Sequence, residues 1–239
     1  MPTTTLGLLG FGFVLGLRHA LDVDHLAAVS TIVSQRRSWW SASLVGALWG
    51  LGHTAALFAV GLVVIVGHAE IPPPLARGLE LGVAAMLVGL GVNLLWTLRR
   101  DGTLHHHAHA HGGRLHVHPH VHTPAETPDG HHHGRLRGRR PFLVGLAHGL
   151  AGSAGLMLAV LATIPSPPLA LAYVVIFGCG SIGGMVAMST LLGMPLALAA
   201  EGFARIEVLL RTCAGLGSVA VGLVLAWRIG VEAGLRLSA

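Results

Sequence analysis

The chain has 239 residues, of which 53% are hydrophobic and only 10% are charged. Soluble domains carry about 25% charged residues, so this composition and a mean hydropathy of +0.70 exclude an ordinary soluble domain and predict an integral membrane protein. The isoelectric point near 10.9 comes from arginines alone, because the chain has no lysine. Most of these arginines lie beside apolar runs, which indicates that they set the membrane topology and do not bind nucleic acid.

The first predicted membrane span covers residues 6–34 and carries five ionisable side chains near its middle. They are Arg18, His19, Asp22, Asp24 and His25. A helix of this length reaches about 40 Å, which exceeds the ~30 Å hydrocarbon core, so these groups would lie near the bilayer centre. Ionisable groups at that depth are costly unless they are paired or hydrated, which makes them candidates for a function.

Five further apolar spans follow, and prolines, arginines or tryptophans mark most of their ends. We place them at residues 41–67, 75–98, 141–164, 169–194 and 206–229. The segment 101–140, called the His-rich loop below, holds 12 of the 17 histidines, with glycine, proline and arginine between them. Such a composition cannot bury a core and predicts a disordered loop.

The chain therefore divides into three parts: residues 1–100 with three spans, the His-rich loop, and residues 141–239 with three more. The loops after the first, third and fifth spans hold 11 arginines, against three on the opposite side. By the positive-inside rule, the protein lies in the cell (inner) membrane with the His-rich loop in the cytoplasm and both termini outside.

Three short stretches recur in the same order at offsets of 128 to 131 residues. The matched stretches are 16–21 with 145–150, 49–53 with 177–181, and 91–96 with 222–227. Each half has an odd number of spans, so the two halves would cross the membrane in opposite directions. We therefore expect an all-α membrane protein with six transmembrane helices in a 3+3 inverted repeat. Transporters built this way bind substrate between the repeats, near the midplane.

The first span has ligand chemistry suited to a transition metal. On an ideal helix Asp22 lies about 60° from His19, and His25 about 60° further on, so one face presents two imidazoles and a carboxylate. This set suits Ni²⁺, Co²⁺ or Zn²⁺. Asp24 lies off that face and joins the site only if the helix is distorted or the metal is approached from the side. Two interpretations of Asp22 stay open: a metal ligand, or an ion pair with Arg18 that would leave Asp24 as the ligand.

Two histidines in later spans are further candidates for the site. His53 follows Gly50-Leu51-Gly52, and these glycines permit close approach of another helix. His53 is therefore either part of the site or a hydrogen-bonding partner of a neighbouring helix. His148 is the repeat counterpart of His19 but lacks acidic neighbours, so it either completes the site from the second half or bonds across helices.

These residues resemble a known family. His19, Asp24 and His25 fit the pattern H-x4-D-H, the signature of the NiCoT-type nickel/cobalt permeases, and Leu51-Gly52-His53-Thr54 resembles their second motif, L-G-H-S/T. The resemblance implies that His19, Asp24, His25 and His53 select the metal. In the second half, residues 145–154 and 178–185 are more similar to the six-span urease-accessory and efflux-like branch of the same superfamily.

The residues and the resemblance together predict a secondary transporter and not an enzyme. Its substrate would be Ni²⁺, then Co²⁺, then Zn²⁺, with no resident cofactor. The lipid bilayer and a nickel-enzyme maturation pathway are its expected partners. One alternative is an exporter in place of an importer. Another is a histidine-box metalloenzyme, which would need several His boxes or an H-E-x-x-H helix, neither of which the chain contains. The His-rich loop either holds further ions or is low-complexity sequence without effect.

Overall fold

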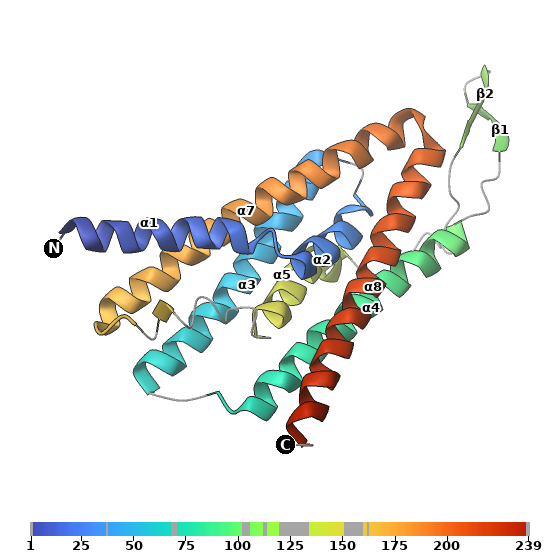
Figure 1. Ribbon diagram of the computed structural model, residues 1–239. Coiled ribbons are helices and arrows are strands. Elements are labelled where there is room, and N and C mark those ends of the chain that lie inside the picture. The colour runs from blue at the N-terminus through green and yellow to red at the C-terminus, as the bar shows by residue number, and fades with distance from the viewer. Residues whose placement is uncertain are drawn as a thin grey trace.

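The computed structural model describes most of the chain and shows a bundle of α-helices (Figure 1). The described residues are 2–36, 38–67, 71–101, 106–111, 114–119, 134–150, 160–161 and 163–237. The helices are α1 (Pro2–His19), α2 (Val23–Val33), α3 (Trp39–Gly67), α4 (Pro73–Asp101), α5 (Gly134–Leu150), α7 (Pro167–Gly202) and α8 (Ala204–Leu237). Helices suit a bilayer because they satisfy their backbone hydrogen bonds internally.

Four of these helices, α3, α4, α7 and α8, are long and apolar enough to cross a membrane, and α1 with α2 would make a fifth crossing as a bent pair. The chain is thus a multi-pass membrane protein, as its composition predicts. The span expected at 141–164 begins in α5, but residues 151–159 lie outside the described part. Helix α7 runs beyond its expected end at residue 194 and continues through Pro195 to Gly202.

The first span is not the continuous helix that we expected. Helices α1 and α2 meet at an angle of 56°, because the chain turns between them. The backbone N–H of Asp22 donates to the carbonyl of His19 at 3.1 Å, and Asp22 itself is extended, with φ −61° and ψ 144°. Aspartate readily replaces helical hydrogen bonds with local ones. The straight-helix arc therefore does not hold for this chain, and the distortion under which Asp24 was expected to join the site is present.

The His-rich loop contains regular structure where we expected disorder. Strands β1 (His106–His111) and β2 (Arg114–Pro119) pair antiparallel, with His107 opposite His118. The physical reason is that a two-stranded ladder satisfies its backbone groups locally and needs no buried core, while apolar residues alternate with histidine along much of both segments. Helix α5 also begins inside the expected loop, at Gly134, and the loop's remaining residues 102–105, 112–113 and 120–133 lie outside the described part.

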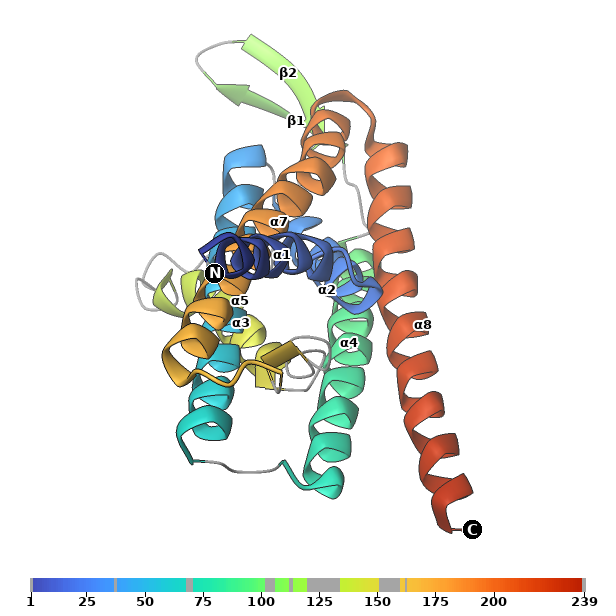
Figure 2. The ribbon, with the colours of Figure 1, turned by 60° about the vertical axis from the view of Figure 1, so that its left-hand side comes forward.

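The helices pack as pairs: α3 against α7 and α5, α1 against α7, and α4 against α8. Helix α1 lies across α7, and α8 runs beside α4 (Figures 1 and 2). Figure 2 shows the hairpin and the junction between α7 and α8 at one end of the bundle. The end of α3, the start of α4 and the C-terminus lie at the other end, whereas the N-terminus lies between the two levels.

Close helix contacts recur between the two halves of the chain. A Cβ added to Gly16 of α1 would collide with the carbonyl oxygen of Phe177 in α7. A Cβ added to Gly145 of α5 would collide in the same way with the carbonyl oxygen of Trp49 in α3. The residue pairs differ by 129 and 128 positions, which are the offsets of the repeat seen in the sequence. Only glycine lets these backbones approach so closely.

A third close contact connects α4 and α8 and also occurs twice. A Cβ on Gly91 would meet the carbonyl oxygen of Gly215 at 2.5 Å, and a Cβ on Gly222 would meet that of Ala84 at 2.7 Å. Gly91 and Ala84 correspond to Gly222 and Gly215 at an offset of 131. The two close contacts between α4 and α8 are thus formed by equivalent positions of the two halves.

Two apolar clusters form the described core. The first includes Ala28, Val33, Trp49 and Met185, and the second includes Leu15, Leu57, Tyr173 and Phe177. Along α3, Trp49 of the first cluster lies one helical turn before His53, and Leu57 of the second lies one turn after it. The predicted site therefore sits at a polar level between two apolar layers.

Candidate metal site

Four histidines from four helices meet in the interior of the protein. His19 ends α1, His25 lies in the first turn of α2, His53 is in the middle of α3, and His148 is near the end of α5. Their exposed fractions are 7%, 1%, 0% and 0%, respectively. The break between α1 and α2 places the rings of His19 and His25 in contact. The close approach of α5 to α3 at Gly145 places His148 in the same cluster.

His19, His25 and His53 form one group of possible metal ligands, called the three-histidine set below. Their candidate ligand atoms all lie within 4.8 Å of one another. Nε2 of His19 is 3.0 Å from Nε2 of His53, and the ring of His25 meets both rings edge-on, with centroids 4.6 Å and 4.9 Å away. One ion placed among the three rings would be within reach of all of them.

Asp24, His25 and His148 form a second such group, called the aspartate set below. Nε2 of His148 donates to Oδ2 of Asp24 at 3.1 Å, and Nδ1 of His25 donates to Oδ1 at 3.1 Å. The backbone N–H of His25 also donates to Oδ1, at 3.0 Å. Asp24 thus joins α2 to α5 across 124 residues of sequence, and His25 belongs to both sets.

The carboxylates fix which ring nitrogens carry a lone pair. A carboxylate only accepts hydrogen bonds, so His19 must donate from Nδ1 to Oδ2 of Asp22, which is 2.8 Å away. In the neutral rings this leaves the lone pairs on Nε2 of His19 and His25 and on Nδ1 of His148. The carboxylates thereby present these lone pairs as metal ligands, a common arrangement in metal sites.

Three of the buried ring nitrogens have no hydrogen-bond partner among the described residues. They are Nε2 of His25, Nδ1 of His53 and Nδ1 of His148. Buried polar atoms are nearly always satisfied, and leaving one unpaired costs about 1–3 kcal/mol. Three such atoms in one cluster indicate a binding site whose ligand would contact these nitrogens.

Asp22 contacts His19 and not Arg18. Its side chain is half-exposed, at 49%, and its carboxylate lies against Nδ1 of His19. Arg18 is exposed, and within the described ranges no ion pair joins it to Asp22. The interpretation of Asp22 as the ion-pair partner of Arg18 is therefore wrong. The carboxylate of Asp22 accepts no capping hydrogen bond from the first turn of α2, because it accepts one from His19 instead.

Two aromatic residues that were not among the predicted site residues border the cluster. Phe177 of α7 packs on the ring of His19, with centroids 5.4 Å apart, and Trp49 of α3 packs on His148 at 5.5 Å. Both residues belong to the matched repeat stretches, and that match was the signal in the sequence that could have identified them.

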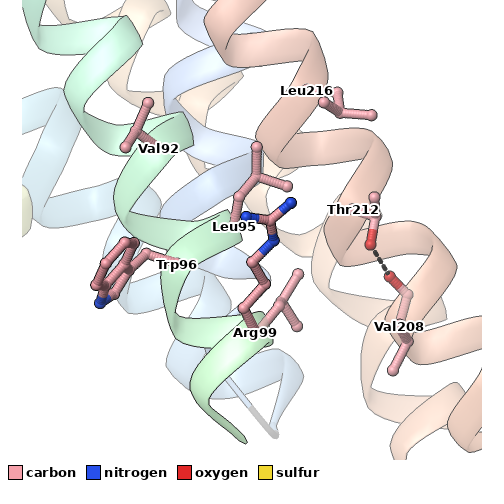
Figure 3. Close-up of a pocket in the computed structure, with 8 residues that line it drawn as sticks. Val92, Leu95, Trp96, Arg99, Val208, Thr212 and Leu216 are labelled. Atoms are coloured by element: carbon pink, nitrogen blue, oxygen red, sulfur yellow. Dashed lines mark hydrogen bonds between the residues drawn. The ribbon is translucent and has the colours of Figure 1, made fainter. Parts of the chain in front are cut away.

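A separate cavity of about 540 Å³ lies between α4 and α8 (Figure 3). It is lined by Val92, Leu95, Trp96, Leu98, Arg99, Val208, Thr212 and Leu216. None of its lining residues is a histidine or a carboxylate, so it lacks the ligands that the histidine cluster offers.

Comparison with known proteins gives one relative along the whole chain. The chain is 35% identical to the urease accessory protein UreH of Bacillus sp. (strain TB-90) over 230 residues, which cover 96% of this chain and 95% of UreH. It is also 35% identical to the nickel transporter NicT of Mycobacterium tuberculosis over 63 residues, 26% of this chain and 17% of NicT. No family model and no solved structure matches. The chain belongs to the family of the urease accessory protein UreH, within the nickel/cobalt transporter superfamily.

Proposed function

We propose that this protein is a secondary transporter that moves a divalent transition-metal ion, Ni²⁺ first and Co²⁺ next, through the buried histidine cluster. The observation that carries the proposal is the group of three buried imidazole nitrogens, on α2, α3 and α5, that have no hydrogen-bond partner among the described residues. The names of UreH and NicT, one a urease accessory protein and the other a nickel transporter, support it. Both names also favour a carrier over an enzyme.

The ligand chemistry supports a borderline divalent ion as the cargo. Neutral imidazoles with a carboxylate suit Ni²⁺, Co²⁺ and Zn²⁺, whereas Ca²⁺ and Mg²⁺ prefer sites made of oxygen ligands. Asp22 and Asp24 together can balance the two positive charges of the ion, which would otherwise be costly in the membrane interior. His53 can change tautomer: with its proton on Nδ1, which has no hydrogen-bond partner among the described residues, the lone pair on Nε2 becomes free to bind an ion.

We further propose six membrane spans arranged as a 3+3 inverted repeat. The recurring contacts of Gly16 with α7 and of Gly145 with α3 support this arrangement, as does the paired contact between α4 and α8. The fourth span would continue from α5 through residues 151–159. Transport would then follow from rocking one repeat against the other around the cluster.

The proposed orientation places the His-rich loop in the cytoplasm and both termini outside. The arginine count supports the side of the loop. The structure is consistent with the C-terminal part of this assignment, since the hairpin lies at one end of the bundle and the C-terminus at the other (Figure 2). A cytoplasmic His-rich loop suits either an acceptor after uptake, feeding a nickel-enzyme maturation pathway, or a collector before export.

Transport of radioactive nickel-63 into proteoliposomes tests the proposal. We expect saturable uptake by the wild type that Co²⁺ inhibits, about tenfold above protein-free liposomes and above a His19→Ala, His25→Ala double variant, because that variant loses two imidazoles of one set. Uptake no greater than that of the double variant, with Co²⁺ and Zn²⁺ equally negative, would refute transport through this site. Running the assay with the gradient reversed gives the direction.

Deletion of residues 103–134 is expected to lower the number of metal ions bound per chain and to leave some transport. Several converging imidazoles can hold a metal ion, but the loop contributes no residue to either ligand set. Equilibrium dialysis measures the stoichiometry, and a full-length variant with the 12 loop histidines replaced by serine separates loop length from chemistry. An unchanged stoichiometry in both variants would show that the loop does not store metal.

A further inference from the structure

Two buried aromatic rings close the histidine cluster from opposite apolar layers. Phe177, exposed at only 2%, lies on His19 with an angle of 39° between the ring planes. Trp49, exposed at 0%, lies on His148 with an angle of 53°. His19 belongs to the three-histidine set and His148 to the aspartate set. Each ligand set therefore has an aromatic ring of its own.

The two aromatic contacts are equivalent positions of the repeat. Phe177 follows Trp49 by 128 residues, and His148 follows His19 by 129. The backbone of each aromatic residue is also the one that a glycine approaches closely, Gly16 at Phe177 and Gly145 at Trp49. The same aromatic–histidine–glycine arrangement thus occurs once in each half, on opposite faces of the cluster.

The rings belong to different apolar layers. Trp49 lies in the first cluster of the core and Phe177 in the second. Within the described part of the chain, all four histidines are buried, whereas the side chains of Asp22 and Asp24 are 49% and 19% exposed. The indole N–H of Trp49 has no hydrogen-bond partner there. An unpaired buried N–H destabilises the closed position of the ring. If the ring moves aside, its N–H can find a hydrogen-bond partner.

We propose that Phe177 and Trp49 are the two gates of the transport pathway, one for each ligand set. This inference rests on the transport function proposed above. Phe177 covers an ion held by His19 and His53, and Trp49 covers an ion held by Asp24 and His148. His25, a member of both sets, keeps contact with the ion while it passes from one to the other. An apolar ring cannot replace the hydration shell of a metal ion, so an ion crosses the apolar layer on either side only after the ring in that layer is displaced.

Release of bound Co²⁺ to excess EDTA, followed by the Co²⁺ absorption band in stopped flow, tests the gates. Phe177→Ala and Trp49→Ala should each release Co²⁺ about tenfold faster than the wild type, while the dissociation constant changes by less than about threefold, because a lost gate speeds entry and exit alike. A purely structural role would weaken binding without speeding entry. Phe177→Leu and Trp49→Phe, which keep most of the bulk, should give intermediate rates.

The double variant Phe177→Ala, Trp49→Ala distinguishes two gates from one. In proteoliposomes it should leak Co²⁺ down its gradient about tenfold faster than either single variant, because no closed layer remains. Leu87→Ala, a buried truncation on α4 with no part in either ligand set, is the matched control and should behave as the wild type.

Release at the wild-type rate by both alanine variants, with Co²⁺ still bound, would overturn the gates and leave the transport proposal standing. So would a double variant that leaks no faster than the single ones. If the alanine variants do not purify as monodisperse protein, the size-retaining variants decide, and wild-type rates in both would overturn the inference. A wild type that binds no Co²⁺ would instead refute the proposed function itself.

Discussion

Replacement of His25 by alanine is expected to weaken binding of Ni²⁺ and Co²⁺ more than any other single substitution, by about 100-fold or more. The reason is that, among the described residues, His25 alone belongs to both ligand sets and holds a lone pair on Nε2 that has no hydrogen-bond partner there. His53→Ala and His148→Ala each remove a ligand from one set only. We expect each of them to lower affinity about tenfold and to stop transport, because the ion then lacks one of its two positions.

Calorimetric titration of the purified variants with Ni²⁺ measures this ranking. Ser181→Ala is a suitable control, because Ser181 is buried, has no hydrogen-bond partner in the described structure and occupies the repeat position of His53. Its affinity should stay within about twofold of the wild type, as expected for a group outside both sets. A monodisperse His25→Ala protein with near wild-type affinity would show that the ion is held elsewhere.

Substitution of Gly16 or Gly145 by alanine is expected to destabilise the fold strongly and to similar extents. The added Cβ of either residue would collide with a backbone carbonyl, of Phe177 or Trp49, and a backbone cannot move aside as a side chain can. Overpacking of this kind costs about 3 kcal/mol, which corresponds to a fall of about 10 °C in melting temperature for a chain of this size.

Gly10→Ala provides the control within the same helix as Gly16. Nothing lies within 4 Å of a Cβ at that position, and alanine favours a helix over glycine by about 1 kcal/mol, so no loss is expected. Thermal unfolding in detergent, followed by tryptophan fluorescence, compares the three variants. Equal melting temperatures for Gly10→Ala and Gly16→Ala would contradict the close approach of α1 to α7, and a loss at only one of Gly16 and Gly145 would weaken the case for the repeat.

The sequence singled out the candidate residues because ionisable groups stand out in apolar segments. His19 and His25 were recognisable in this way, while the flanking glycines and the repeat position pointed to His53 and the offset between the halves to His148. The six predicted site residues do lie together in the structure. The contacts of each residue were harder to predict, because helical periodicity assumes a straight helix and the chain turns at Asp22. That turn places Asp24 in the cluster and brings the carboxylate of Asp22 within hydrogen-bond distance of His19.

Composition alone determined the class of this protein, since a chain this rich in apolar residues and poor in charge can bury its surface only in a membrane. Spacing within the sequence further indicated which side chains carry the chemistry. Only the tertiary structure decided that Asp24 bonds to His148 across 124 residues, that His25 serves two ligand sets, and that Phe177 and Trp49 lie over His19 and His148. The physical reason is that such contacts depend on how helices meet. Helix packing in this protein depends on close backbone contacts at glycines and on the break between α1 and α2. Neither can be predicted from the periodicity of the sequence.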